Sequence, residues 1–397
     1  MRPTSARVDA VQPAIIPQVA EWIRAHPGTI SLGQGVAGYG PPPEAWEELE
    51  RLRREPMLHR YQPVGGFPEL VEALQRRLSR RLGLTVGPRR GLVVTAGANA
   101  AFQQVILAIC DPGDEVLLPV PWFFNQEMAL TLANVRAVPV PCDARHWPDV
   151  DALANAVTAR TRAIVTVSPN NPTGAVYPRS DLLAINTLCR ERGLFHISDE
   201  TYEAFTHDDV RHESPGAFPD ATEHTISLFS FSKAYGFASW RIGYAVLPAT
   251  LHLPMRAIQD TWLICPPVAS QLAALGCLRA PDDWLETRLA EVRATRVRVL
   301  EGLRELESWV SMGPADGAFY VFLQLAGEID AVELTHRLIV ANGVAVMPGT
   351  AFGLNSNPSL RVAYGALSPS TASEGIGRLV TGLERFRAQG ILSAKHD

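Results

Sequence analysis

Short apolar segments of five or six residues recur through the middle of the chain, and longer stretches between them repeat apolar residues every three or four positions. Short apolar runs bounded by turn residues are typical of buried strands, and the longer period is typical of amphipathic helices. Strands are predicted at 91–96, 115–119, 136–140, 163–168, 194–198, 225–229 and 242–247, with helices at 98–110 and 180–192. This alternation predicts an α/β fold with a mostly parallel seven-stranded sheet covered by helices.

The pattern changes after residue 281. One long helical period covers 282–306, and it is followed by predicted strands at 317–322, 344–347 and 360–364 and by predicted helices at 331–341 and 371–389. The first 43 residues are rich in Gly and Pro, which favours an extended arm. The sequence therefore predicts three parts. They are an arm at 1–43 that contributes to a smaller α+β domain, a large domain at 44–281, and an interdomain helix with the small C-terminal domain at 282–397.

Composition narrows the class of protein. The 397 residues are 47% hydrophobic and 19% charged, which is typical of a soluble globular enzyme. A net charge of −5 gives no overall attraction to nucleic acid, and the arginines at 51–54 and 76–81 alternate with Leu at helical spacing, as on solvated helix faces. No apolar run approaches the roughly 20 residues of a membrane span, and Pro13 and Pro17 interrupt any signal-peptide core.

Five widely spaced cysteines never form a Cys-x-x-Cys pair. This usage predicts a cytoplasmic location and no metal site.

One lysine, Lys233, lies between the apolar run 226–231 and the predicted strand 242–247. An exposed lysine usually has polar neighbours, whereas this position places an amine at the edge of a buried sheet. Burial lowers the pKa of a lysine amine below its free value of about 10.4, and the neutral amine attacks carbonyl groups. Lys233 is therefore a candidate covalent catalyst. The alternative is a lysine whose stem packs while its ammonium group stays in water.

Polar residues follow two of the predicted strands, at the sheet edge where α/β folds bind ligands. The loop 168–174 contains two prolines, which stiffen it, and Asn171, whose amide can bind an anionic oxygen; the same residues also favour turns. Asp199 ends a strand, where a carboxylate is poorly solvated unless it meets a cation such as a pyridine nitrogen or caps a helix. Tyr202 can reach the same ligand or pack in the core.

Small residues at 95–101 join a strand to a helix, and free backbone NH groups at Gly97 and Ala98 favour a bound phosphate. Close packing of the helix on the strand explains the same pattern without a ligand. Arg241 begins a strand eight residues after Lys233 and is a candidate for a bidentate phosphate contact or for an ordinary salt bridge.

These groups follow successive strands in one order. Asn171-Pro-Thr-Gly, Asp199-x-x-Tyr202, Ser230-x-x-Lys233 and Arg241 together resemble the fold type I, class I and II aminotransferases that use pyridoxal phosphate, and within them the aspartate, aromatic and kynurenine group. The resemblance extends over most of the chain, through Gln34-Gly35, Tyr61-x-Pro-x-Gly-Gly66, Asp111-Pro-Gly-Asp114, Gly317-Ala-Phe-Tyr320, and Pro348-Gly349 before Arg361.

The resemblance implies pyridoxal 5'-phosphate as the cofactor and assigns roles to the matching residues. Lys233 would form the internal aldimine and carry the proton at the substrate α-carbon. Asp199 would keep the ring nitrogen protonated, and Asn171 and Tyr202 would bind the phenolic oxygen. An aromatic ring would stack on the cofactor, and Phe123 fits the family's spacing after Pro121, with Trp122 as the alternative.

The remaining roles concern the phosphate and the substrate. Ser230, Arg241, Gly97 and Ala98 would hold the phosphate, and so would Tyr61 of the partner subunit in a homodimer. Arg361 would clamp the substrate carboxylate, with Asn171 and the backbone of Gly35 assisting.

Transamination between an L-amino acid and a 2-oxo acid is the favoured reaction. A lyase or synthase of the same fold, of the C–S lyase or cyclase type, would use the same residues, and a binding module that kept the fold is the third alternative. No second arginine lies in a motif for a dicarboxylate substrate. The aromatic candidates favour an aromatic or apolar side chain, and they are Tyr39, Phe123, Phe124, Trp240 and Trp262.

Overall fold

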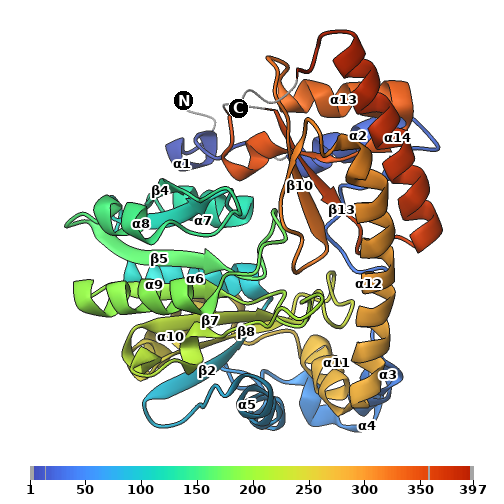
Figure 1. Ribbon diagram of the computed structural model, residues 1–397. Helices are drawn as coiled ribbons and strands as arrows, with labels where there is room; N and C mark the ends of the chain where they lie inside the picture. The colour runs from blue at the N-terminus through green and yellow to red at the C-terminus, as the bar shows by residue number, and fades with distance from the viewer. Residues whose placement is uncertain (1–3, 14, 356–357, 394–397) are drawn as a thin grey trace.

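A seven-stranded sheet forms the centre of the larger part of the molecule (Figure 1). The computed structural model describes residues 4–13, 15–355 and 358–393, so the predicted domain ends at 1 and 397 lie outside it. The strand order is β2-β8-β7-β6-β5-β3-β4, and only β8 runs antiparallel to its neighbours. All seven predicted strands are confirmed, as β2 (Arg90–Thr95), β3 (Glu115–Val120), β4 (Arg136–Pro141), β5 (Thr161–Val167), β6 (Phe195–Asp199), β7 (Thr225–Ser230) and β8 (Gly243–Pro248).

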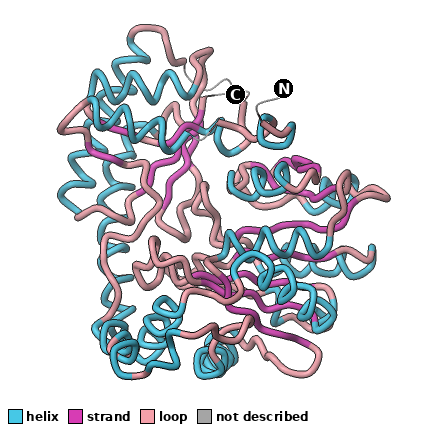
Figure 2. Tube along the Cα trace, turned by 180° about the vertical axis from the view of Figure 1, so that it is seen from behind, coloured by secondary structure: helices cyan, strands magenta, loops and turns pink. Residues whose placement is uncertain are grey.

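Helices cover both faces of this sheet, as Figure 2 shows from behind. In β5, Val165 packs in the cluster that contains α6 and α10, while Ile164 packs in the cluster of α8 and α9. Burial on both faces is the reason that the central strands read as continuous apolar runs. β4 is one of the two edge strands, and an edge strand tolerates the prolines of its sequence because one of its sides has no neighbouring strand. The covering helices are α6 (Ala98–Ile109), α7 (Phe124–Leu132), α8 (Val150–Ala156), α9 (Arg179–Arg192) and α10 (Ala249–Leu263).

Three neighbouring parallel strands end at the same edge of the sheet. The register pairs Val167 of β5 with Asp199 of β6, and β7 continues to Ser230 beside them. Residues that follow these strands are therefore brought together although they lie far apart in the sequence.

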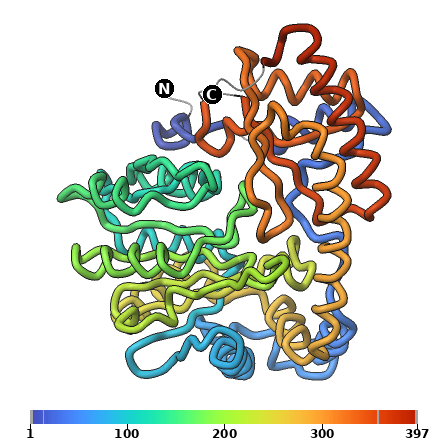
Figure 3. The backbone as a smooth tube through the Cα atoms, viewed as in Figure 1, coloured from blue at the N-terminus to red at the C-terminus, as the bar shows by residue number. Residues whose placement is uncertain are grey.

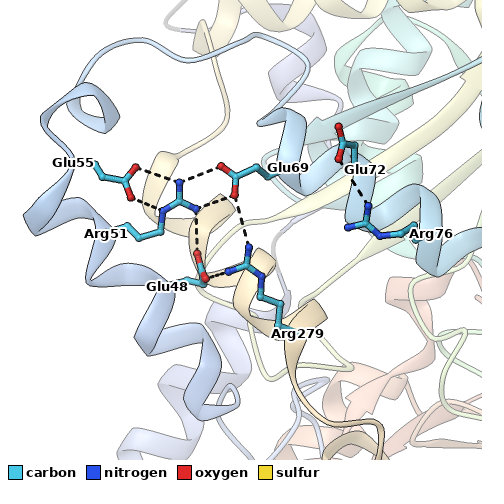
Figure 4. Close-up of polar contacts among 7 residues, drawn as sticks. All are labelled: Glu48, Arg51, Glu55, Glu69, Glu72, Arg76 and Arg279. Atoms are coloured by element: carbon cyan, nitrogen blue, oxygen red, sulfur yellow. Dashed lines mark hydrogen bonds and ion pairs between the residues drawn. The ribbon is translucent and has the colours of Figure 1, made fainter.

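A further group of helices lies near β2 and contains α3 (Pro43–Leu49), α4 (Arg51–Arg54), α5 (Pro68–Leu82) and α11 (Val268–Arg279). Arg51 of α4 donates hydrogen bonds to Glu55 at 2.8 Å and to Glu69 of α5 at 3.0 Å, and Arg279 of α11 bonds Glu48 (Figure 4). The hydrogen bond to Glu55 is the largest cause that raises the pKa of Arg51. Each ion pair near the surface contributes little stability, and together these pairs connect α3, α4, α5 and α11.

The long helix α12 (Asp282–Leu303) connects this layer to a smaller unit at the C-terminal end. Its sheet has the order β12-β13-β10-β9, and α13 (Ala331–Asn342) and α14 (Pro369–Ala388) pack beside it. The N-terminal segment lies among these C-terminal elements, as the blue and red tubes of Figure 3 show. There β1 (Ile30–Ser31) pairs with β11 (Val344–Ala345), and α2 (Ile15–Ala25) contacts α13.

Two predicted strands of this unit differ from the structure. The predicted strand at 344–347 divides into β11, which pairs with β1, and β12 (Met347–Pro348), which pairs with β13 (Ser359–Ala363). The predicted strand at 317–322 begins later, as β10 (Tyr320–Gln324), because Ala318 has a positive φ of 53° and its backbone NH bonds Phe205 instead of a strand. The remaining elements are α1 (Ala6–Asp9), β9 (Ser311–Met312), η1 (Pro56–His59), η2 (Pro215–Ala217), η3 (Ala221–Glu223), η4 (Arg304–Leu306) and η5 (Gly349–Phe352).

No helix within the described residues has both the length and the apolar composition that crossing a membrane requires. Across the same residues, no group of three His, Cys, Asp or Glu side chains is arranged to hold a metal ion.

Candidate active site

A cavity of about 440 Å³ opens at the shared edge of β5, β6 and β7. Residues from both sheets line it, because β10, β13 and the N-terminal segment of the smaller unit close over the ends of the three strands. Most of the residues predicted from the sequence lie here. Those that line the cavity are Gly35, Ala98, Phe123, Asn171, Asp199, Tyr202, Ser230, Lys233, Arg241 and Arg361.

A groove of similar volume, about 460 Å³, lies between α5 and the junction of α11 with α12. Four of its five arginines have carboxylate partners. Arg76 pairs with Glu72 at 3.8 Å (Figure 4) and Arg80 with Asp282 at 3.1 Å, and Arg77 and Arg279 are also paired. None of the residues predicted to be catalytic lines this groove.

Lys233 follows β7 and is half-buried against the cavity. Its ammonium Nζ donates a hydrogen bond to the backbone oxygen of Gly35 at 2.6 Å. Burial, together with the nearby guanidinium groups of Arg361 and Arg241, lowers the pKa of Lys233 to about 8, against the opposing effect of Asp199. A substantial fraction of the amine is therefore neutral near pH 8, as a nucleophile requires.

Asp199 is the last residue of β6 and is buried beside the cavity. The backbone NH of Thr201 donates to its Oδ1 at 3.1 Å, and the side-chain amide of Gln126 donates to its Oδ2 at 2.9 Å. Burial raises the pKa of Asp199, and these hydrogen bonds oppose the rise. A carboxylate in this position is stabilised by a cation placed in the cavity.

Two tyrosines and an asparagine form the wall between Lys233 and the small sheet. The hydroxyl groups of Tyr202 and Tyr320 are 2.5 Å apart, and burial raises the pKa of both. Asn171 faces the cavity, whereas its neighbour Asn170 bonds Tyr177 and Thr173 and so builds the loop.

Arg361 extends from β13 and is buried. It donates to Asn171 Oδ1 at 2.8 Å and to the backbone oxygen of Gly33 at 2.7 Å, while its Nε is buried without a hydrogen-bond partner. Burial lowers the pKa of Arg361, and the nearby Tyr320 opposes this effect. A buried guanidinium with an unpaired donor is suited to bind a ligand carboxylate.

Arg241, Ser230 and the first turn of α6 form another wall of the cavity. Gly97 precedes the helix with φ of +87°, and a Cβ at this position would lie 2.5 Å from Arg241 Nη2. The missing side chain thus lets the guanidinium group approach the NH groups of the helix N-terminus. Together these groups form a region suited to an anion.

The aromatic candidates separate into two groups. Phe123 and Phe124 line the cavity, whereas Trp122 packs against Gly353, which favours Phe123 as the stacking ring. Tyr39, Trp240 and Trp262 do not line the cavity of their own chain. Tyr39 packs on Trp284, and the ring centroids of Trp240 and Phe237 are 4.8 Å apart in a stacked pair. Trp262 is exposed on α10. These three side chains therefore do not form the substrate pocket of their own chain that the sequence suggested.

Tyr61 lies outside the cavity with 80% of its surface exposed. Sequence reasoning missed Gln126, because an amide on an amphipathic helix gives no sign of what it contacts. It also gave Tyr320 no role, although this residue belongs to the motif Gly317-Ala-Phe-Tyr320; a tyrosine at the start of a buried strand was the available signal.

Comparisons with known proteins agree over nearly the whole chain. The sequence profile of "Aminotransferase class I and II" matches residues 27–379. The chain is 31% identical to an aromatic aminotransferase of Arabidopsis thaliana, covering 95% of each protein. It is 34% identical to an aspartate/prephenate aminotransferase of Thermus thermophilus, covering 97% of the chain and 98% of the relative. A solved single mutant of Thermus thermophilus aspartate aminotransferase superposes with a TM-score of 0.88 at 32% identity, over 96% of the chain and 100% of the other.

Proposed function

The chain belongs to the class I and II aminotransferases, and we propose that its amino donor is an aromatic or apolar L-amino acid. Members of the family use pyridoxal phosphate, so the protein is an enzyme that transfers an amino group from an amino acid to a 2-oxo acid with this cofactor.

The charges of the cavity fit this cofactor. Pyridoxal phosphate has a basic ring nitrogen and a phosphate group, and the cavity offers a buried carboxylate at Asp199 and an anion-binding region at Arg241, Ser230 and Gly97. The buried, unpaired Nε of Arg361 leaves a donor for a further anionic group.

Each of these residues would act on one part of the bound molecules. The cofactor supplies an electron-withdrawing ring that stabilises negative charge at the substrate α-carbon. Asp199 would hold a proton at the ring nitrogen. Asn171 and Tyr202 would donate hydrogen bonds to the phenolic oxygen, and Phe123 would lie against the ring. Lys233, with a pKa of about 8, would attach the cofactor and move the proton at the α-carbon.

The proposed donor class depends on the charges of the cavity. Lys233, Arg241 and Arg361 are its cationic side chains among the described residues, and each has a role that does not involve a substrate side chain. The apolar surface of the cavity is supplied by Ile16, Val36, Phe123, Phe124 and Met347. A second carboxylate would lack a cation in this chain's part of the cavity, whereas an apolar side chain would be desolvated favourably.

Single half-reactions test this proposal directly. With phenylalanine or leucine, the absorbance of the loaded enzyme should change at a rate at least about tenfold higher than with aspartate at equal concentration. Burying an unpaired carboxylate costs more than about 1.4 kcal/mol, which corresponds to this factor. Stopped-flow spectroscopy without a 2-oxo acid measures this step. A faster reaction with aspartate would contradict the proposed donor class. Release of pyruvate and ammonia from cysteine, whose β-thiol can leave, would indicate elimination instead of transamination.

Gly97 permits a matched pair of substitutions. Gly97→Ala places a methyl group against Arg241, whereas Gly113→Ala has the same kind of positive φ, +93°, with no atom within 4 Å. Both variants place a side chain on a backbone conformation that L residues rarely adopt, and each should lose about 1 to 3 kcal/mol of stability. Only Gly97→Ala should weaken pyridoxal phosphate binding, by about tenfold or more, in fluorescence titrations of cofactor-free protein. Equal binding by the two variants would show that this turn does not hold the phosphate.

A homodimer with shared sites is part of the proposal. Tyr61 does not reach the cavity of its own chain, and large apolar residues are exposed near it on the same helical layer and on α10, namely Trp46, Met57 and Trp262. We infer that a second copy covers this surface and that Tyr61 of the partner subunit binds the phosphate. Sedimentation of the loaded enzyme tests the assembly, and a fully active monomer would contradict it.

Two further predictions remain proposals. The three-part division at 1–43, 44–281 and 282–397 is supported by the separation of the seven-stranded sheet from the two smaller sheets, and limited proteolysis near residues 43 and 281 tests it. A cytoplasmic location is supported by the five free cysteines, and fractionation of cells tests it.

A further inference from the structure

We propose that Gln126 is a positioning residue that keeps Asp199 ionised and oriented toward the cofactor. The inference rests on the proposed role of Asp199, and it goes beyond that role because Gln126 itself does not line the cavity. Gln126 would therefore act through the carboxylate, without touching the cofactor.

The contact is short and shielded from solvent. The Nε2 of Gln126 donates to Asp199 Oδ2 at 2.9 Å, and only 2% of the Gln126 surface is exposed. The NH of Thr201 donates to the other oxygen, Oδ1, at 3.1 Å. With one fixed donor on each oxygen, rotation of the carboxylate would break both hydrogen bonds.

The first turn of α7 couples this contact to the stacking ring. Phe123 is the N-cap residue of α7 and lines the cavity, and Gln126 lies three residues later, where its NH donates to Phe123 O at 2.9 Å. Residues three apart share one side of a helix. One turn thus presents a ring to the cavity and an amide to the carboxylate behind it.

Gln126 supplies a favourable contact that does not titrate. Burial is the main cause that raises the pKa of Asp199, and the hydrogen bonds from Thr201 oppose this rise. The adjacent Glu200 adds to the rise, and the hydrogen bond from Gln126 is a smaller opposing effect. The ionisable groups that interact with Asp199 are Glu200, Tyr202 and Lys233. An amide donates at every working pH, so this contribution to the ionised carboxylate does not change between pH 6 and 9.

Two substitutions distinguish this role from simple packing. Gln126→Leu removes the donor at similar size and should weaken pyridoxal phosphate binding about tenfold to hundredfold at every pH, the range for a hydrogen bond to a charged group. Gln126→Glu adds a carboxyl group that donates to Asp199 only while protonated. The dissociation constant of the Gln126→Glu variant for pyridoxal phosphate should be at most about three times the native value at pH 6. At pH 9 it should be more than about thirty times the native value.

Fluorescence titration of cofactor-free protein from pH 6 to 9 measures these ratios. Gln104→Leu is the matched control, since it removes a buried amide that bonds Gln259 at 3.2 Å and not a carboxylate; it should bind as the native protein does. Thermal unfolding checks that each variant folds. Native-like binding by Gln126→Leu, or a ratio for Gln126→Glu that does not change with pH, would overturn the inference. If the native protein itself binds no pyridoxal phosphate, the proposed function fails instead.

Discussion

Lys233→Ala should abolish transamination, with the first half-reaction slowed by more than about a thousandfold, because one amine both attaches the cofactor and moves the proton at the α-carbon. Among the described residues, no other lysine can substitute for it. Lys233 and Lys395 are the only lysines of the chain, and the cavity's other cations are arginines, which stay protonated and do not attack carbonyl groups. Stopped-flow spectroscopy with saturating donor measures the loss.

The scarcity of lysine also gives a clean control. Lys395→Ala should keep full activity, and borohydride reduction of the loaded native protein, followed by peptide mass spectrometry, should place the cofactor on Lys233. Label on Lys395, or a half-reaction by Lys233→Ala at more than a few per cent of the native rate, would contradict the assignment.

The pKa of Lys233 makes the loading step dependent on pH. Since burial lowers this pKa to about 8, the neutral amine becomes the major form above that value. The rate at which cofactor-free enzyme takes up pyridoxal phosphate should therefore rise with pH and level off above about 8.

The sequence predicted the site where neighbouring strands fix it. Val167, Asp199 and Ser230 end adjacent parallel strands, so locating the strands was enough to bring the following residues to one edge. It did not predict which side of a turn each side chain takes. Asn170 and Asn171 are identical in type, yet one builds the loop and the other faces the cavity.

Contacts between segments that are distant in the sequence were harder to predict. Gln126 meets Asp199 across 73 positions of sequence, and nothing in its own helix indicates a carboxylate. Residues 344–347 read as one strand because all are apolar, but partners far away in the chain divide them between two sheets. Tyr39 and Trp240 read as pocket residues because aromatic character does not specify what a ring packs against.

Arg361→Lys should lower kcat/KM for the amino donor about hundredfold while leaving the affinity for pyridoxal phosphate unchanged. A lysine keeps the positive charge but offers no planar fork, and it cannot hold Asn171 and Gly33 while also bonding a carboxylate. Losing one hydrogen bond to a charged group lowers kcat/KM about 10- to 100-fold, and misplacement of the substrate lowers it further. Initial rates over a range of donor concentrations measure the effect, and Arg337→Lys on the exposed face of α13 is the control.

The same arginine acts on Lys233 through its charge, and this separates two roles of one side chain. Because Arg361 lowers the pKa of Lys233, a substitution that removes the cation, Arg361→Met, should raise this pKa and move the midpoint of cofactor loading above about 8. Arg361→Lys keeps the cation and should leave that midpoint in place. The fork would then set substrate binding, whereas the charge alone would set the reactivity of Lys233. An equal shift of the loading midpoint in both variants would show that the position of the guanidinium group, and not its charge, controls the amine.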